Sequence, residues 1–207
     1  MKYEWRKQEK EFYTMKKQPK IVTIPKQRFM SLHGIGDPNG KDFNEKIQIL
    51  YPASYGVKGA YKKYCLDKDV EFEDYVVFPL EGVWSLTTKG QQMDHLDKNE
   101  FEYDIMIRIP DFVPNELIQV SLDETRDKKN LSGISKIEIK EYPEMQVGQI
   151  LHIGSYDDEP TSFEKIDELV GKEGKSRTSK IHREIYLSDA RRVAPDKLKT
   201  VLRYQIK

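Results

Sequence analysis

Alternation of apolar and polar residues predicts eight strands in this chain. Runs rich in β-branched and aromatic residues, bounded by Gly, Pro, Asn or Asp, are typical of strands that bury one face. Such runs occupy residues 21–24, 28–35, 75–86, 101–109, 134–141, 145–153, 182–188 and 200–206. Pro25 with Lys26 predicts a tight turn, so the first two strands are expected to form a hairpin, and Tyr142, Pro143 and Glu144 predict a corresponding turn later in the chain.

Apolar residues at helical spacing predict three helices between these strands. The first begins near Asp42 and should be kinked or shortened by Pro52. The second covers about residues 114–130. The third follows Pro160, where Thr161 and Glu164 have the spacing of a capping box. Clustered strands that alternate with single helices predict an α+β fold with antiparallel sheets and helices on one face.

Two segments of sixteen residues are nearly the same and indicate a duplicated unit. Leu32 to Ile47 reads LHGIGDPNGKDFNEKI, and Leu151 to Ile166 reads LHIGSYDDEPTSFEKI. A duplication usually folds as two like halves about a pseudo-twofold axis, with a groove between them that suits a ligand. The alternative is chance similarity between two segments of the common strand, loop and helix type.

The repeats also predict how the chain is divided. Residues 1–19 are expected to form an N-terminal arm on a single domain at residues 20–207. Within that domain, one repeat covers about residues 20–110 and the other residues 134–207, joined by the helix at about 114–130. Whether the arm covers the groove stays open.

Composition argues against nucleic acid, metal ions and membranes as partners. The chain of 207 residues carries 35 basic and 35 acidic side chains, so no net charge favours nucleic acid, and the arm is too short for a helix-turn-helix module. The single Cys65 and four scattered histidines predict no metal site, and we expect no cofactor. No apolar run suits a membrane helix or a signal peptide, which predicts a cytoplasmic protein, either monomer or homodimer.

The strand at residues 182–188 carries the most suggestive chemistry. Alternation places His182, Glu184 and Tyr186 on one face, and Ile185 and Leu187 on the other, which is expected to meet a helix. An imidazole, a carboxylate and a phenol would then line the face opposite that helix. The alternative is an ordinary half-exposed sheet with polar residues in water.

Several phrases resemble the stand-alone branch of the GyrI-like (gyrase-inhibitor-like) small-molecule-binding family. They are PLEGVW (79–84), MIRIPDFVP (106–114), LHIGSYDDEPTSFEKI (151–166) and HREIYLSDARRVAPDKLKTVLRYQIK (182–207). The resemblance runs from about Tyr3 to the end of the chain. It implies a pseudo-symmetric fold whose central groove holds lipophilic aromatic or cationic ligands, with a carboxylate on the penultimate strand, here Glu184. Stand-alone relatives resemble either scavengers of toxic compounds or hydrolases that open the cyclopropane ring of DNA-alkylating natural products.

These considerations give a set of candidate site residues. Glu184 is expected to act as base or electrostatic anchor, and Tyr186 or His152 as donor to a developing oxyanion. The candidates for ligand contact, which could instead serve core packing or turns, are Trp84, Tyr55, Tyr156, Tyr142 and His182.

Three further residues have two possible roles each. His33 and His152 occupy the same place in the two repeats and could be pocket groups, although a histidine at a strand end more often binds its own turn. Alternation places Glu81 opposite Trp84, so the two can share a face only if Gly82 marks a bulge.

Three functions therefore compete. The first is a hydrolase of cyclopropane-bearing genotoxins that confers resistance. The second is non-catalytic sequestration or sensing of aromatic or cationic drugs, in which the carboxylate is only a counter-charge. The third is a protein-interaction role such as the protection of gyrase, which the family name suggests and the residues support least.

Overall fold

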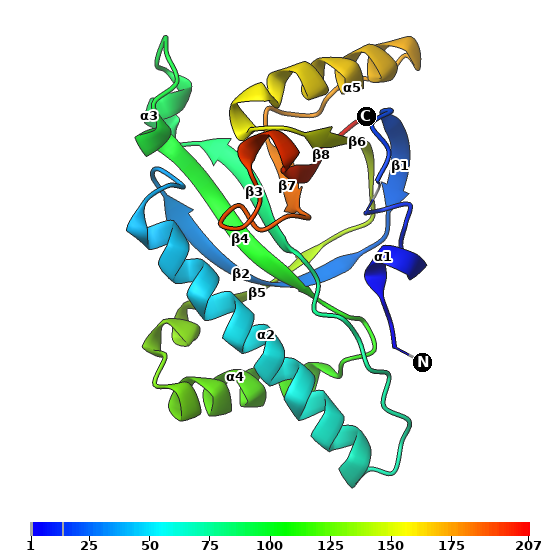
Figure 1. Cartoon of the computed structure of the whole chain (residues 1–207), viewed down its shortest axis with the longest axis vertical. Helices are drawn as coiled ribbons and strands as arrows, with labels where there is room; N and C mark the ends of the chain where they lie inside the picture. Colours follow the sequence, from blue (N-terminus) through cyan, green and yellow to red (C-terminus); the bar gives the residue numbers. More distant parts are fainter. Residues whose placement is uncertain (1, 14) are drawn as a thin grey trace. The chain divides into compact units, whose positions relative to one another are not determined.

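The computed structural model of the chain describes residues 2–13 and 15–207 (Figure 1). All strand pairs named below are antiparallel, and helices lie between groups of strands along the chain. The predicted α+β fold is therefore confirmed. The chain forms two compact units. Unit one contains Gln27–Phe78 and Leu86–Tyr142 with the N-terminal residues up to Gln8, and unit two contains Glu9–Lys26, Pro79–Ser85 and Pro143–Lys207.

The strands lie close to the predicted ranges. They are β1 (Lys20–Ile24), β2 (Gln27–Ile35), β3 (Leu80–Leu86), β4 (Phe101–Ile109), β5 (Glu138–Tyr142), β6 (Met145–Ile153), β7 (His182–Tyr186) and β8 (Lys199–Gln205). The α-helices are α1 (Trp5–Gln8), α2 (Lys41–Asp67), α3 (Thr88–Gln91), α4 (Asn115–Lys129) and α5 (Pro160–Lys172). Short 3-10 turns are η1 (Lys98–Glu100), η2 (Ser132–Lys136), η3 (Tyr156–Asp158) and η4 (Pro195–Lys197).

Unit one combines a three-stranded sheet, in the order β5, β2, β4, with α2 and α4. Leu32 and Ile105 are paired across β2 and β4, and both are buried. On the same face the Tyr103 hydroxyl donates to Asp42 of α2 at 3.1 Å. Helices α2 and α4 cross closely (Figure 1). The absence of a side chain at Gly56 permits this approach, since a Cβ atom there would lie only 2.0 Å from Thr125 Oγ1.

Helix α2 continues through Pro52, so the expectation that this proline shortens the helix is wrong. Proline has no N–H, which costs the helix one bond to the carbonyl four residues earlier. The side chains that offset this loss lie on both sides of the proline and are buried: Leu50, Ala53, Val57, Tyr61 and Cys65. Packing in the folded chain therefore outweighs the local preference of one residue.

Unit two contains a five-stranded sheet in the order β1, β6, β8, β7, β3. One face packs against α5 (Figure 1) and is called the α5 face. Here Ile150 and Leu202 of the sheet form one buried cluster with Ile166 and Val170 of the helix. A Cβ atom at Gly148 would lie 2.5 Å from the Ile166 side chain, so glycine allows the helix to approach β6 closely.

The opposite face of this sheet carries a row of buried polar side chains, here called the polar row: Gln149, Arg203, Arg183 and Glu81. The N-terminal segment supplies acceptors for it. Gln149 Nε2 donates to the carbonyl of Glu11 at 2.6 Å, and Arg203 donates to that of Phe12. Within unit two, the segment therefore lies on the face opposite α5.

Strand pairing differs from the predicted hairpin. Strand β1 pairs with β6, whereas β2 pairs with β4 and β5. Val22 and Ile24 of β1 pack with Val147 of β6 in one buried cluster, which explains the choice of partner. Pro25 and Lys26 therefore connect the two units and do not close a hairpin.

Some predicted boundaries also differ. The predicted strand at 75–86 begins only at Leu80, and that at 134–141 begins at Glu138 after η2. Helix α5 begins at Pro160 with Glu159 as N-cap, and Thr161 Oγ1 donates to the Asp158 carbonyl at 2.9 Å, so Thr161 is not the cap. Among the helices in the described residues, none has the length and apolar character needed to cross a membrane.

Candidate functional site

Strand β7 turns Glu184 toward the α5 face. Glu184 pairs across the sheet with Leu202, and cross-strand partners share a face. Leu202 packs against α5, and the His182 ring lies edge-on to Phe163 of α5 with centroids 5.0 Å apart. The expectation that Ile185 and Leu187 face the helix is therefore wrong. Alternation correctly identified which residues share a face. The face with Glu184 can nevertheless be buried beneath the helix, because His182 and Tyr186 on the same face form hydrogen bonds with the carboxylate.

Hydrogen bonds hold the Glu184 carboxylate from two sides. His182 Nε2 lies 3.0 Å from Oε1, and the Tyr186 hydroxyl donates to Oε2 at 2.9 Å. Trp84 Nε1 of β3 donates in turn to the Tyr186 oxygen at 2.9 Å. Three of the predicted site residues thus gather around Glu184 on two neighbouring strands of unit two.

Two more residues complete this group from the segment before α5. The Tyr156 ring of η3 lies edge-on to that of Tyr186, with centroids 6.1 Å apart. Glu159, the N-cap of α5, lies near enough to Glu184 for the Glu184 charge to act on it. We call the six residues the Glu184 cluster: Trp84, Tyr156, Glu159, His182, Glu184 and Tyr186.

Both tyrosines of the cluster keep their protons at neutral pH. Burial first, and then the Glu184 charge, raises the pKa of Tyr186 well above its ordinary value. The same two causes raise the pKa of Tyr156 to about 12. Each phenol is therefore available as a hydrogen-bond donor.

Sequence reasoning missed Glu159. Its carboxyl is 6% exposed, and burial, followed by the neighbouring Glu184 charge, raises its pKa above the ordinary range. The available signal was positional: Pro160 favours the first position of a helix and so places Glu159 at the N-cap, where glutamate is not among the preferred residues. A disfavoured residue at a defined cap position could have pointed to another role.

The strand β3 has no bulge at Gly82. Its register with β7 is continuous, with Gly82 opposite Glu184 and Trp84 opposite His182. Glu81 therefore faces the polar row, where its Oε2 lies 3.5 Å from Arg183 Nη1, and is separate from the Glu184 cluster.

Gly82 leaves the space in which Trp84 and Tyr186 meet. A Cβ atom there would lie 2.5 Å from Trp84 Nε1 and 3.0 Å from the Tyr186 hydroxyl oxygen. We therefore expect Gly82→Ala to displace the indole and break its hydrogen bond to Tyr186. The Trp84 indole N–H resonance would report the displacement. Gly59→Ala is the control, since its added methyl meets no atom within 4 Å; an unchanged resonance in Gly82→Ala would contradict the expectation.

Three predicted residues have other surroundings. His152 is buried, and its ring nitrogens lie 2.9 Å from Ser162 Oγ and 2.9 Å from the Ser155 carbonyl, so it binds its own turn. Tyr55 lies on α2 in unit one and is 61% exposed. Tyr142 ends β5 in unit one and packs edge-on against Phe29.

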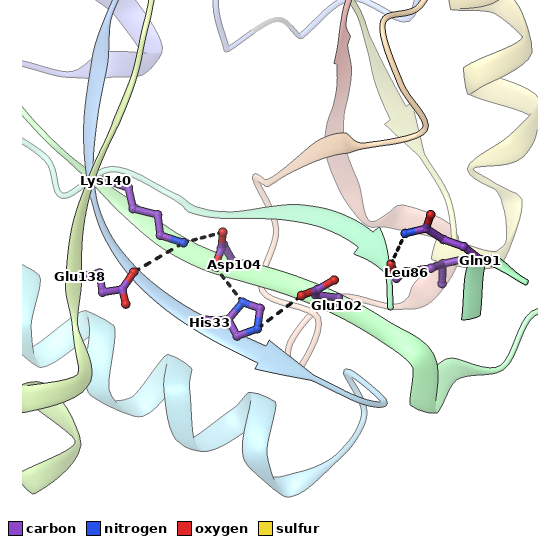
Figure 2. Close-up of polar contacts among 7 residues, drawn as sticks. All are labelled: His33, Leu86, Gln91, Glu102, Asp104, Glu138 and Lys140. Atoms are coloured by element: carbon purple, nitrogen blue, oxygen red, sulfur yellow. Dashed lines mark hydrogen bonds and ion pairs between the residues drawn. The ribbon is translucent and has the colours of Figure 1, made fainter. Parts of the chain in front are cut away.

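His33, the counterpart of His152, belongs to a charged network on the sheet of unit one (Figure 2). Its Nδ1 lies 3.3 Å from Asp104 and its Nε2 lies 3.7 Å from Glu102. Lys140 lies 2.8 Å from Asp104 and 3.7 Å from Glu138. Half-exposed pairs of this kind contribute roughly 0–1 kcal/mol each, so the network is an ordinary surface feature.

The Glu184 cluster therefore combines two carboxyl groups, an imidazole, two phenols and an indole near the N-terminal end of α5. In residues 2–13 and 15–207, no group of three or more His, Cys, Asp and Glu side chains has an arrangement that could hold a metal ion. The residues present can offer a ligand negative charge, O–H and N–H donors, and aromatic surface.

Comparison with solved structures gives close matches along the full length. A hydrolase from Listeria innocua is 28% identical with a TM-score of 0.83, and an uncharacterized conserved protein from Listeria innocua is 29% identical with a TM-score of 0.85. Each match covers 100% of both chains. The EcmrR C-terminal domain, at 14% identity and a TM-score of 0.52 over 92% of this chain and 97% of that one, shares the fold.

Comparison with sequences gives a family match but no match to an individual curated protein. No curated protein matches the chain. Residues 17–207, which include every residue of the Glu184 cluster, match the family described as the GyrI-like small molecule binding domain. On the strength of that match, this chain belongs to the GyrI-like small-molecule-binding domain family.

Proposed function

We propose that the Glu184 cluster binds a flat aromatic small molecule and that Glu184 assists the addition of water to a strained cyclopropane ring of that molecule. The observation that carries this proposal is a carboxylate held between His182 and Tyr186, with the Trp84 indole behind the phenol. Membership in a small-molecule-binding family and 28% identity to a Listeria hydrolase support it. The cyclopropane follows from the resemblance to stand-alone relatives that open such rings.

The reaction adds one water to the substrate. As the water oxygen bonds to a ring carbon, one C–C bond of the cyclopropane breaks, and its electron pair passes through the conjugated dienone to the carbonyl oxygen. Glu184 accepts a proton from the water, and the new phenolate takes a proton from a donor or from solvent. Each oxygen of a carboxylate can accept two hydrogen bonds, so Glu184 can receive a water in addition to its present partners.

Tyr186 is the donor that we favour for the developing oxyanion. Its hydroxyl group rotates, so its proton can turn from Glu184 to a ligand oxygen while Trp84 continues to donate to it. His152 is less suitable, because both of its ring nitrogens are bonded within its own turn.

Sequestration without chemistry is the second candidate. It is favoured by the two hydrogen bonds to the Glu184 carboxylate, since they hold this group in place as a counter-charge for an aromatic cation. Protection of gyrase has no comparable support.

Incubation with a duocarmycin-type cyclopropane compound tests the proposal. We expect the mass of one water to be added to more than one equivalent of compound per protein, faster than in buffer or with heat-denatured protein. Liquid chromatography with mass detection measures this. Saturable binding of the intact compound would favour sequestration, and the absence of both binding and turnover would contradict the hydrolase and leave only aromatic cations as ligands.

A further inference from the structure

The two glutamates of the Glu184 cluster are both buried. Glu159 is 6% exposed and Glu184 is 9% exposed, and the charge of Glu184 acts on the Glu159 carboxyl group. Ionised carboxylates only accept hydrogen bonds, so two of them cannot bond to each other. A hydrogen bond between these groups would therefore require one proton, and two buried like charges that act on each other resist the ionisation of both groups.

Unequal surroundings decide which carboxyl holds the proton. The Glu184 carboxyl group is hydrogen-bonded to His182 through Oε1 and to Tyr186 through Oε2. Glu159 Oε1 is buried and has no hydrogen-bond partner in the part of the chain that the structure describes. A carboxyl without donors gains most from becoming the donor itself, so the proton belongs on Glu159.

The other charges near Glu159 act in the same direction. Besides Glu184, Asp157 of η3 raises the pKa of Glu159 by repulsion, after the larger effect of burial. Tyr156 and Tyr186 face the pair as neutral phenols, and Asp189 acts on Tyr156 together with both glutamates. His182, the remaining titratable group that faces the pair, is bonded to Glu184.

We propose that Glu159 and Glu184 form an acid and carboxylate pair that holds one proton at neutral pH, and that a lipophilic cation bound against the pair displaces this proton. The second part rests on the proposed function, in which the Glu184 cluster is the ligand site. On binding, the proton leaves Glu159 for the solvent and the cation takes its place, so the net charge of the site stays at minus one. A neutral ligand leaves the proton in place.

Elementary electrostatics makes this exchange favourable. A cation a few ångströms from Glu159 stabilises its ionised form and lowers its pKa. The effect is reciprocal, so ionising Glu159 strengthens the binding of the cation by the same factor. Trp84 and Tyr156 supply the aromatic faces that attract cations and stack on flat rings. Glu159 would thus be a specificity residue that lets one site accept neutral and cationic aromatic ligands.

The first test needs no ligand. We expect the infrared spectrum at pH 7 to show a carbonyl stretch from one buried protonated carboxyl, which Glu159→Gln removes. Glu164→Gln is the matched control, because it removes an exposed glutamate from the same helix and should leave the band unchanged. Absence of the band in the wild-type protein, or its persistence in Glu159→Gln, would overturn the shared proton.

The second test counts protons during binding. N-methylacridinium serves as the probe, because its charge does not change with pH, and calorimetry in buffers of different ionisation enthalpy measures the protons released. We expect about one proton per bound probe in the wild-type protein and in Glu164→Gln, and none in Glu159→Gln. Binding without release would overturn the exchange while leaving the proposed site intact. No binding of N-methylacridinium would overturn the exchange, and the duocarmycin-type compound would then show separately whether the proposed function also fails.

The free energy of unfolding, measured at two pH values, tests the proton on Glu159 and also shows whether Glu159→Gln folds. The pKa of Glu159 is raised on folding, so between its unfolded and folded values the native state holds one proton more than the unfolded state. Stability is therefore lost as pH rises, and the equilibrium constant for unfolding should increase by up to tenfold per pH unit from this group. Urea unfolding at pH 6 and pH 8 should show this slope in the wild-type protein and a smaller one in Glu159→Gln. Equal slopes would overturn the shared proton.

Discussion

Glu184→Gln is expected to lower the rate of cyclopropane hydrolysis by about 10² to 10⁴, the range that a positioned general base contributes. The amide keeps the shape of the carboxylate and can still bond to Tyr186, but it cannot accept a proton from water. Binding of a neutral substrate should change little, so the loss should appear in kcat and leave KM nearly unchanged. Initial rates over a range of substrate concentrations measure both.

The matched control for this prediction is Glu164→Gln, which removes an exposed carboxylate from α5 and should turn over at the wild-type rate. A second comparison separates hydrolysis from simple capture. In a passive binder, Glu184→Gln would weaken cationic ligands and leave neutral ones unaffected. Unchanged turnover in Glu184→Gln would remove this residue from the mechanism.

Glu81→Ala is expected to destabilise the protein by about 3–5 kcal/mol, the usual consequence of removing one partner of a buried ion pair. Glu81 is 1% exposed, and its Oε2 lies 3.5 Å from Arg183 Nη1. The substitution leaves the Arg183 charge in the buried polar row without this carboxylate. The free energy of unfolding in urea, compared with the wild-type value, tests the prediction.

Two variants make the result interpretable. Glu164→Ala changes an exposed glutamate and should alter the free energy of unfolding by no more than about 0.5 kcal/mol. Replacing Glu81 and Arg183 together with leucine and methionine should recover much of the loss, because a buried ion pair can often be exchanged for apolar side chains. A loss below about 1 kcal/mol in Glu81→Ala would show that the pair contributes little.

Local patterns were sufficient for the strands and helices but not for their partners. Strands β4 and β6 have the predicted bounds, because the alternation of side chains is a property of the strand itself. Pairing is a property of the whole chain. A turn sequence at Pro25 predicted a hairpin, whereas burial of Val22 and Ile24 against Val147 directs β1 to a strand far along the sequence.

The candidate site shows the same limit. Alternation predicted that His182, Glu184 and Tyr186 share a face, and their hydrogen bonds follow from that placement. It did not predict that α5 covers this face, since the apolar face with Ile185 and Leu187 was expected to meet the helix. Glu159 was missed for a similar reason: its unusual place at the N-cap was a signal, but its relation to Glu184 depends on a strand that follows it in the chain.

The order of strands in unit two has a consequence for how the chain folds during synthesis. The C-terminal strand β8 lies between β6 and β7, and Lys20 of β1 pairs with Gln149 of β6. Of the five strands, the one in the middle of this sheet is therefore synthesised last, and β1 waits for a partner that is made much later. Such long-range pairing is slow and exposes strand edges to aggregation. Chaperone binding to the nascent chain would protect unit two most during this interval.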